Sequence, residues 1–149
     1  MQKTKLKINM KNLKIFVLAT ILTSIFIGGI YFSRFLPKQN KIPNYARRTE
    51  EVKLAYEFAL SNPEVLTKIP CYCGCDRLGH QSVENCFVKE FKKDGGVVFE
   101  KHGAYCGMCY SIVLETKELF EQGKNISEIR QYIDNKYSKY GGQPTNTPL

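Results

Sequence analysis

The sequence has no acidic residue before Glu50, and this absence accounts for its net charge of +8. Ten of its 22 lysines and arginines lie in residues 1–48, so twelve remain against 14 acidic residues over 49–149, a net charge of −2. This longer part of the chain therefore lacks the excess of basic residues that binds the phosphate backbone of nucleic acids. We expect no nucleic-acid partner.

Motifs of several common enzyme classes are missing as well. The chain has no phosphate-binding glycine loop, no Ser/His/Asp grouping, no paired carboxylates at a matching spacing and no internal repeat. Segments rich in β-forming residues are too few for the βαβ fold of thioredoxin-like proteins. The sequence thus gives no support to a hydrolase or a nucleotide-binding protein. We expect no enzyme, with thiol redox chemistry as the main enzymatic alternative.

An apolar run near the N-terminus has neither a charge nor a proline over residues 15–32. A helix of this length measures about 27 Å, close to the roughly 30 Å core of a bilayer. A cleaved signal peptide is the alternative, but no Ala-x-Ala site follows the run, and no cysteine beside it could carry a lipid. We expect a transmembrane signal anchor over 15–36, preceded by a basic cytoplasmic tail over 1–14. The chain would then be a single-pass protein of the cell membrane with its C-terminal domain outside the cytoplasm.

Downstream of the anchor, residues 37–48 contain two prolines and mostly polar side chains, which is typical of a linker. Residues 49–140 predict one small, mostly α-helical domain, and residues 141–149 a disordered tail. A domain of this size is marginally stable by itself, so a metal or a crosslink would help it to fold.

Helix signals begin at Thr49, a plausible N-cap that two glutamates follow. Val52, Ala55, Tyr56, Ala59 and Leu60 fall on one face of the helix expected there. A short helix is expected from Pro63, with Asn62 as its cap, and a further helix over Val83–Phe91, capped by Ser82. An extended piece is expected over Val97–Phe99, followed by a helix from Cys106 to about Gln122. The last predicted helix runs from Ser127 to about Ser138, with Ile129, Tyr132 and Ile133 facing inward.

All six cysteines lie within residues 71–109, with both histidines between them. They are Cys71, Cys73 and Cys75 in a C-x-C-x-C run, Cys86, and the C-x-x-C pair Cys106 and Cys109, with His80 and His102 interleaved. If the C-x-C-x-C run is extended, its thiols point to one side about 7 Å apart. The C-x-x-C pair opens a helix, where unpaired N–H groups and the macrodipole favour thiolate.

This pattern predicts a metal site. Disulfide bridges are one alternative, although cysteines two residues apart close strained bridges, and a redox couple at Cys106 and Cys109 is another. A donor set rich in thiolate and free of carboxylate favours Cu(I), with zinc as the second choice because His80 and His102 are available. The six cysteines and the two histidines are thus the candidate ligands, and a metal donor or acceptor protein is a possible partner.

These motifs also resemble a known family. The runs Asn62–Leu66, Pro70-Cys71-Tyr72-Cys73-Gly74-Cys75, Gly79-His80, Cys86-Phe87-Val88 and His102-x3-Cys106-x2-Cys109 are similar to the PCYCGC-motif family of bacterial and archaeal membrane-associated proteins. The likeness covers about residues 50–140. It implies an exported domain with a cysteine-rich centre and names no reaction. Members of the family often look like lipoproteins, from which this chain departs because its apolar run has no cysteine beside it.

Overall fold

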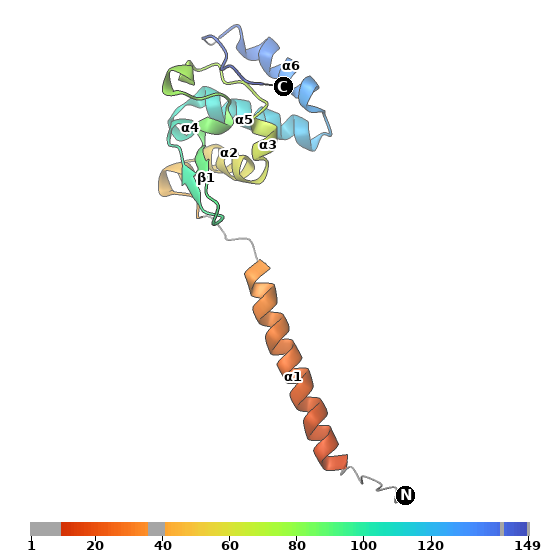
Figure 1. Cartoon of the computed structure of the whole chain (residues 1–149). Helices are drawn as coiled ribbons and strands as arrows, with labels where there is room; N and C mark the ends of the chain where they lie inside the picture. Colours follow the sequence, from red (N-terminus) through yellow and green to blue (C-terminus); the bar gives the residue numbers. More distant parts are fainter. Residues whose placement is uncertain (1–9, 36–40, 141, 149) are drawn as a thin grey trace, which may run out of the picture. The chain divides into compact units, whose positions relative to one another are not determined.

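The computed structural model describes residues 10–35, 41–140 and 142–148 (Figure 1). The chain divides into two compact units, Met1–Lys38 and Gln39–Leu149. Most of the predicted basic tail, the junction between anchor and linker at 36–40, and two positions of the predicted tail, 141 and 149, lie outside the described residues.

The described residues of the first unit form the helix α1 (Met10–Phe35). Its described apolar side chains are exposed, as Phe16 and Phe26 illustrate at 72% and 71%. In α1, side chains are described for residues 13–29 and for Tyr31. Over the described residues, no helix is long and apolar enough to cross a membrane. The transmembrane anchor over 15–36 therefore stays a prediction.

The second unit is a small, mostly α-helical domain, as the sequence predicts. It begins with a 3-10 turn, η1 (Asn44–Arg47), followed by α2 (Glu50–Ser61) and α3 (Pro63–Leu66). Thr49 caps α2 as predicted, because its hydroxyl accepts the N–H of Val52 at 3.3 Å. The predicted apolar face of α2 is buried except at Leu60, which is only partly covered.

Two longer helices, α5 (Gly107–Glu121) and α6 (Ile126–Tyr137), follow later in the chain. The turn between them passes through Gly123, whose φ of +80° suits glycine. The cap of α6 is Asn125 rather than the predicted Ser127, since Asn125 and Glu128 form a reciprocal capping box. Ile129 and Ile133 are buried as predicted, whereas Tyr132 is 43% exposed.

The predicted helix over Val83–Phe91 is wrong. Its first part is a 3-10 turn, η3 (Glu84–Cys86), and the rest is strand β1 (Val88–Phe91). This strand pairs antiparallel with β2 (Val97–Phe99), which confirms the extended piece predicted there. The intervening turn closes with a 2.8 Å hydrogen bond from the N–H of Lys92 to the carbonyl of Gly96. The backbone of β1 finds its hydrogen-bond partners in β2, and the sequence of β1 alone does not reveal this pairing.

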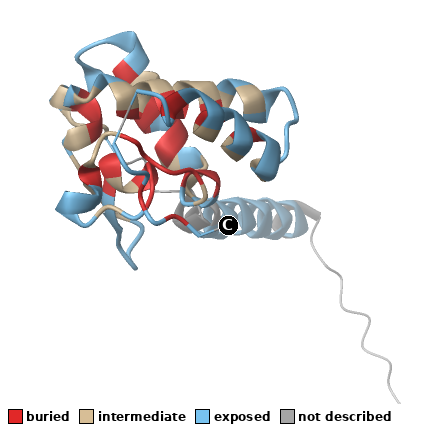
Figure 2. Cartoon of the chain, turned by 90° about the horizontal axis from the view of Figure 1, so that it is seen from above, coloured by how far each residue is buried: buried red, intermediate tan, exposed pale blue. Residues whose placement is uncertain are grey.

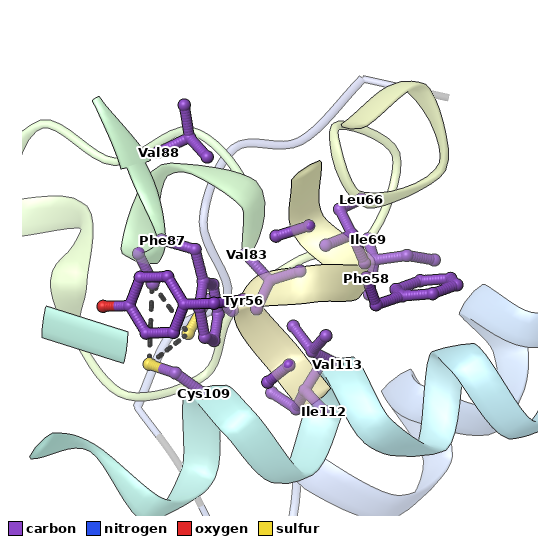
Figure 3. Close-up of a cluster of buried hydrophobic side chains, with 14 of the residues drawn as sticks. Tyr56, Phe58, Leu66, Ile69, Val83, Phe87, Val88, Cys109, Ile112 and Val113 are labelled. Atoms are coloured by element: carbon purple, nitrogen blue, oxygen red, sulfur yellow. Dashed lines mark hydrogen bonds between the residues drawn. The ribbon is translucent and has the colours of Figure 1, made fainter. Parts of the chain in front are cut away.

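The core lies where α5 packs against both α2 and α6. Tyr56 of α2 stands edge-on to Phe87 at 4.9 Å between ring centres, and its hydroxyl donates to the carbonyl of Glu100. Figure 3 shows Cys109 beside this apolar cluster, with dashed lines to neighbouring sulfurs. Two short elements complete the domain, the 3-10 turn η2 (Cys75–Leu78) and the helix α4 (His102–Tyr105). Buried residues include irregular chain as well as helix faces (Figure 2).

Candidate metal centre

The PCYCGC motif folds into a compact turn. Gly74 has a φ of +79°, a conformation that glycine adopts without strain, and Cys75 then begins η2. The sulfurs of Cys71 and Cys73 lie 3.4 Å apart, about half the spacing of 7 Å that an extended chain gives. The expected row of three thiols is therefore wrong, and the Cys75 sulfur instead lies 3.6 Å from that of Cys86.

A second loop, between η2 and β1, supplies Cys86 and His80. It is joined to the chain just before the motif by a 2.9 Å hydrogen bond from the N–H of Val83 to the carbonyl of Ile69. Cys86 is fully buried, and its sulfur lies 3.4 Å from Nδ1 of His80. The loop thus brings one thiol and one imidazole to the motif.

His102 is positioned by the close approach of α4 to Phe87. A Cβ atom at Gly103 would lie 2.6 Å from Cε1 of Phe87 and 2.8 Å from the carbonyl oxygen of Cys86, both too close for any larger residue. This packing leaves Nε2 of His102 3.3 Å from the sulfur of Cys73. A small residue in one helix therefore fixes where a candidate ligand lies.

The C-x-x-C pair lies at the start of α5, as predicted. Cys106 is the N-cap residue, and the N–H of Cys109 donates to its carbonyl at 3.1 Å. The sulfur of Cys109 lies 3.5 Å from each of the sulfurs of Cys71, Cys73 and Cys86. The pair is thus part of a larger group of sulfurs.

The structure brings all eight predicted side chains into one cluster, which we call the thiol cluster. Three sets of four have ligand atoms within 4.8 Å of one another: Cys71, Cys73, Cys86 and Cys109; Cys73, His102, Cys106 and Cys109; and Cys73, Cys75, Cys86 and His102. His80 lies beside these sets, with its ring 5.6 Å from that of His102. Among the described residues, no carboxylate belongs to any of the three sets. The donors are sulfur and imidazole nitrogen, which suit soft and borderline metals.

The six thiols are free. Their contacts of 3.4 to 3.9 Å are far longer than the disulfide bond of about 2.05 Å. They match the edge of a metal coordination tetrahedron, which is about 3.8 Å when metal–sulfur bonds measure about 2.3 Å. The contacts also do not form pairs, because Cys109 and Cys86 each have three sulfur neighbours. This arrangement fits shared metal ligation better than three disulfide bridges.

The thiol cluster has a buried half and a half-exposed half. Cys71, Cys75, Cys86 and Cys109 are at most 2% exposed and belong to the hydrophobic core. The remaining ligand candidates are partly exposed, namely Cys73, Cys106, His80 and His102. A surface cavity of about 370 Å³ is lined by Cys73, and another of about 440 Å³ by His80. Solvent and small solutes thus approach the cluster from the half-exposed side.

Hydrogen bonds among the sulfurs shift the pKa values of the thiols in opposite directions. Hydrogen bonds from Cys109 lower the pKa of Cys71 to about 4, and those from Cys106 lower the pKa of Cys73 well below its usual range. Hydrogen bonding with Cys109 raises the pKa of Cys86. Ionising one thiol opposes ionisation of its neighbours, so full deprotonation needs positive charge among the sulfurs. A bound metal ion supplies that charge.

Described residues of the C-terminal segment, for which the sequence predicts disorder, form hydrogen bonds with the site. Residues 142–148, which we call the C-terminal strap, lie along the PCYCGC turn. Thr145 is 3% exposed, accepts the N–H of Cys71 through its hydroxyl at 2.9 Å and donates its own N–H to the carbonyl of Cys71, also at 2.9 Å. Its hydroxyl also contacts that of Thr147 at 2.9 Å, and Thr147 donates to the carbonyl of Gln81 at 2.6 Å. The strap thereby joins the two loops that carry four of the cysteines.

Sequence reasoning identified every cysteine and histidine of the cluster but not its supports. Gly103 and Thr145 contribute no ligand atom, and neither belongs to a metal-binding motif. Their roles arise from contacts with residues distant in the chain. The one available signal for Gly103 is its place directly after His102.

Comparison with known proteins identifies the family. Residues 37–149 match the family described as "Protein of unknown function with PCYCGC motif". No curated protein and no solved structure matches the chain. The match covers the whole domain, including the linker and the strap, and extends beyond the resemblance seen in the motifs alone. With its six cysteines and two histidines gathered around the motif that names the group, the chain belongs to the PCYCGC family.

Proposed function

We propose that this protein binds Cu(I) through its thiol cluster, outside the cytoplasm and anchored in the cell membrane, and stores or delivers the metal. The observation that carries the proposal is the overlap of three four-donor sets made only of sulfur and imidazole. Six thiols exceed the four ligands that a single zinc ion takes. Thiolates favour Cu(I), and they can bridge several ions in one cluster.

The half-exposed side of the cluster supports delivery. Cys73, Cys106 and His102 can be reached by an incoming ligand while the buried thiols still hold the metal. A donor or acceptor protein would exchange metal there, one ligand at a time. Copper storage would need only the buried half of the cluster. The rate of metal transfer to an acceptor therefore distinguishes the two roles, with fast transfer expected for delivery.

Competition between the two metals tests the proposal. The full chain, purified anaerobically in detergent and loaded with zinc, is titrated with Cu(I) under a chelator of known affinity. We expect zinc release, thiolate-to-copper absorption and more than one Cu(I) per chain. Retention of zinc against excess Cu(I) would contradict the proposal and favour a structural zinc domain whose role is partner binding. A variant with all six cysteines replaced by serine is the control and should bind neither metal.

A thiol–disulfide oxidoreductase is the enzymatic alternative. Cys106 and Cys109 would form its redox couple at the start of α5, but Cys109 also contacts three further sulfurs. The described residues form a single two-stranded antiparallel sheet, which differs from the βαβ setting of thioredoxin-like couples. Turnover of a disulfide substrate by the metal-free chain, lost in Cys106→Ser, would support this alternative over metal binding.

The location is tested separately. A membrane-impermeant protease added to intact cells should remove the domain, and the purified chain should retain residues 15–36. A domain protected in whole cells would contradict the orientation. A mature chain that starts near residue 30 would contradict the uncleaved anchor.

A further inference from the structure

We infer that the thiol cluster forms a dinuclear centre in which Cys73 and Cys109 bridge two metal ions, an inference that rests on the proposed metal binding. Two of the four-donor sets share these two cysteines. The first set adds Cys71 and Cys86, and the second adds His102 and Cys106. Six side chains therefore provide four ligands to each of two ions, provided that the two shared thiolates bridge.

The distance between the shared sulfurs fits this arrangement. The sulfurs of Cys73 and Cys109 lie 3.5 Å apart. In a four-membered ring of two metals and two sulfurs, with metal–sulfur bonds of about 2.3 Å, this separation places the metals about 3 Å from each other. Such a spacing needs no rearrangement of the two sulfurs. One mononuclear site would use only four of the six donors and leave two beside it.

The two metal positions differ in their surroundings. The inner ion would have four sulfur ligands, with the terminal pair Cys71 and Cys86 fully buried and 3.9 Å apart. The outer ion would have three sulfurs and one nitrogen, and its terminal ligands His102 and Cys106 are half-exposed. A competing chelator reaches exposed ligands first. The outer ion should therefore leave before the inner one.

Cys75 lies outside the six-donor set, so its substitution can be compared with that of Cys73. It is 2% exposed, and its sulfur contacts Cys86 at 3.6 Å, so it resembles the inner ligands in burial and in the loop it belongs to. It appears only in the third set, which lacks Cys109. Cys75→Ser should therefore weaken metal binding less than Cys73→Ser, because Cys73 would be a ligand of both ions.

The test uses the full chain in detergent, loaded anaerobically with Cu(I) and, in parallel, with zinc. Native mass spectrometry counts the ions, X-ray absorption measures metal–metal scattering, and chelator transfer is followed in time. We expect two ions per chain, a metal neighbour at about 3 Å and two phases of release. Cys106→Ser should retain one ion and lose the fast phase. Because Cys73 and Cys106 are half-exposed, these two variants avoid a polar group in the core.

Several results would overturn the inference. One ion per chain without a metal neighbour would refute the dinuclear centre and leave the proposed metal binding intact, and the absence of any bound metal would refute both. Three or more ions would show that the third set is also filled. Equal losses in Cys75→Ser and Cys73→Ser would show that Cys73 has no bridging role. The wild-type scattering measurement decides the question even where a variant fails to fold.

Discussion

The sulfur of Cys73 lies 3.3 Å from Nε2 of His102, although 29 positions separate the two residues. His102 belongs to two of the three donor sets, while His80 belongs to none and has its Nδ1 3.4 Å from the sulfur of Cys86. His102→Gln should therefore weaken metal binding more than His80→Gln, for which the loss expected of a residue outside the ligand set is about 10–100-fold. Affinities measured by chelator competition check this. A larger loss in His80→Gln would reverse the roles of the two histidines.

The division of the cluster into two halves predicts an order of thiol modification. In the metal-free chain, Cys73 and Cys106 should react with iodoacetamide before the four buried cysteines, because these two are the partly exposed ones among the six. Metal loading should protect both. Mass spectrometry of peptides after brief alkylation measures the order. Early labelling of Cys86 would show that the buried half opens more readily than the structure indicates.

Gly103→Ala should destabilise the domain. The added methyl group would lie 2.6 Å from the ring of Phe87, and overpacking of this kind costs about 1–3 kcal/mol. Metal affinity should fall as well, since the shift moves His102. Denaturant unfolding compares this variant with Gly107→Ala, where the nearest atom is 3.6 Å from the new methyl group. Similar midpoints for the two variants would contradict the close packing of α4.

Thr145→Val should loosen the PCYCGC turn. The substitution keeps the shape of the side chain but leaves the N–H of Cys71 without its acceptor, and an unsatisfied buried group costs about 1–3 kcal/mol. Amide hydrogen exchange at Cys71 should become faster. Thr67→Val is the matched control, since the Thr67 hydroxyl is exposed and bonds only to the carbonyl of Glu64, three residues earlier. Equal effects of the two variants would contradict the role of the strap in holding the PCYCGC turn.

Removal of metal should lower the melting temperature of the domain. Four of the cysteines lie in the hydrophobic core, so ligand binding and folding share free energy. A metal present at 100 times its dissociation constant stabilises the native state by about 2.7 kcal/mol. Thermal unfolding with and without a chelator measures the difference. The variant with six serines should show no dependence on the chelator, and an equal shift in it would indicate an effect unrelated to the cluster.

Much of the helical architecture could be predicted because its signals are local. Thr49 and Pro63 mark helix starts by their own chemistry, and the periodicity of apolar residues after Thr49 gives the buried face of α2. The sequence does not reveal the strand β1, because Val88–Phe91 forms its backbone hydrogen bonds with β2. This partner lies outside the segment whose apolar periodicity predicts a helix. Ser127 and Asn125 are both good caps, and only the reciprocal bond with Glu128 selects Asn125.

The members of the thiol cluster could be predicted from residue type, whereas their arrangement could not. Spacing alone predicts a row of thiols in the C-x-C-x-C run and a pair of thiols at a helix start, but not that Cys109 contacts Cys71 and Cys73 directly. These contacts join residues 38 and 36 positions apart in the chain. Both depend on tertiary packing.

The C-terminal strap also affects the order in which the site can be completed. Cys71 and Thr145 are 74 positions apart, so a growing chain exposes every one of its thiols well before the residue that clamps the motif is synthesised. During this interval the cysteines are open to oxidation and to wrong metals. A chain cut after α6 would retain all eight ligand candidates and still lack the clamp. If the protein is exported, as proposed, the cell would therefore have to keep the thiols reduced until the strap has docked.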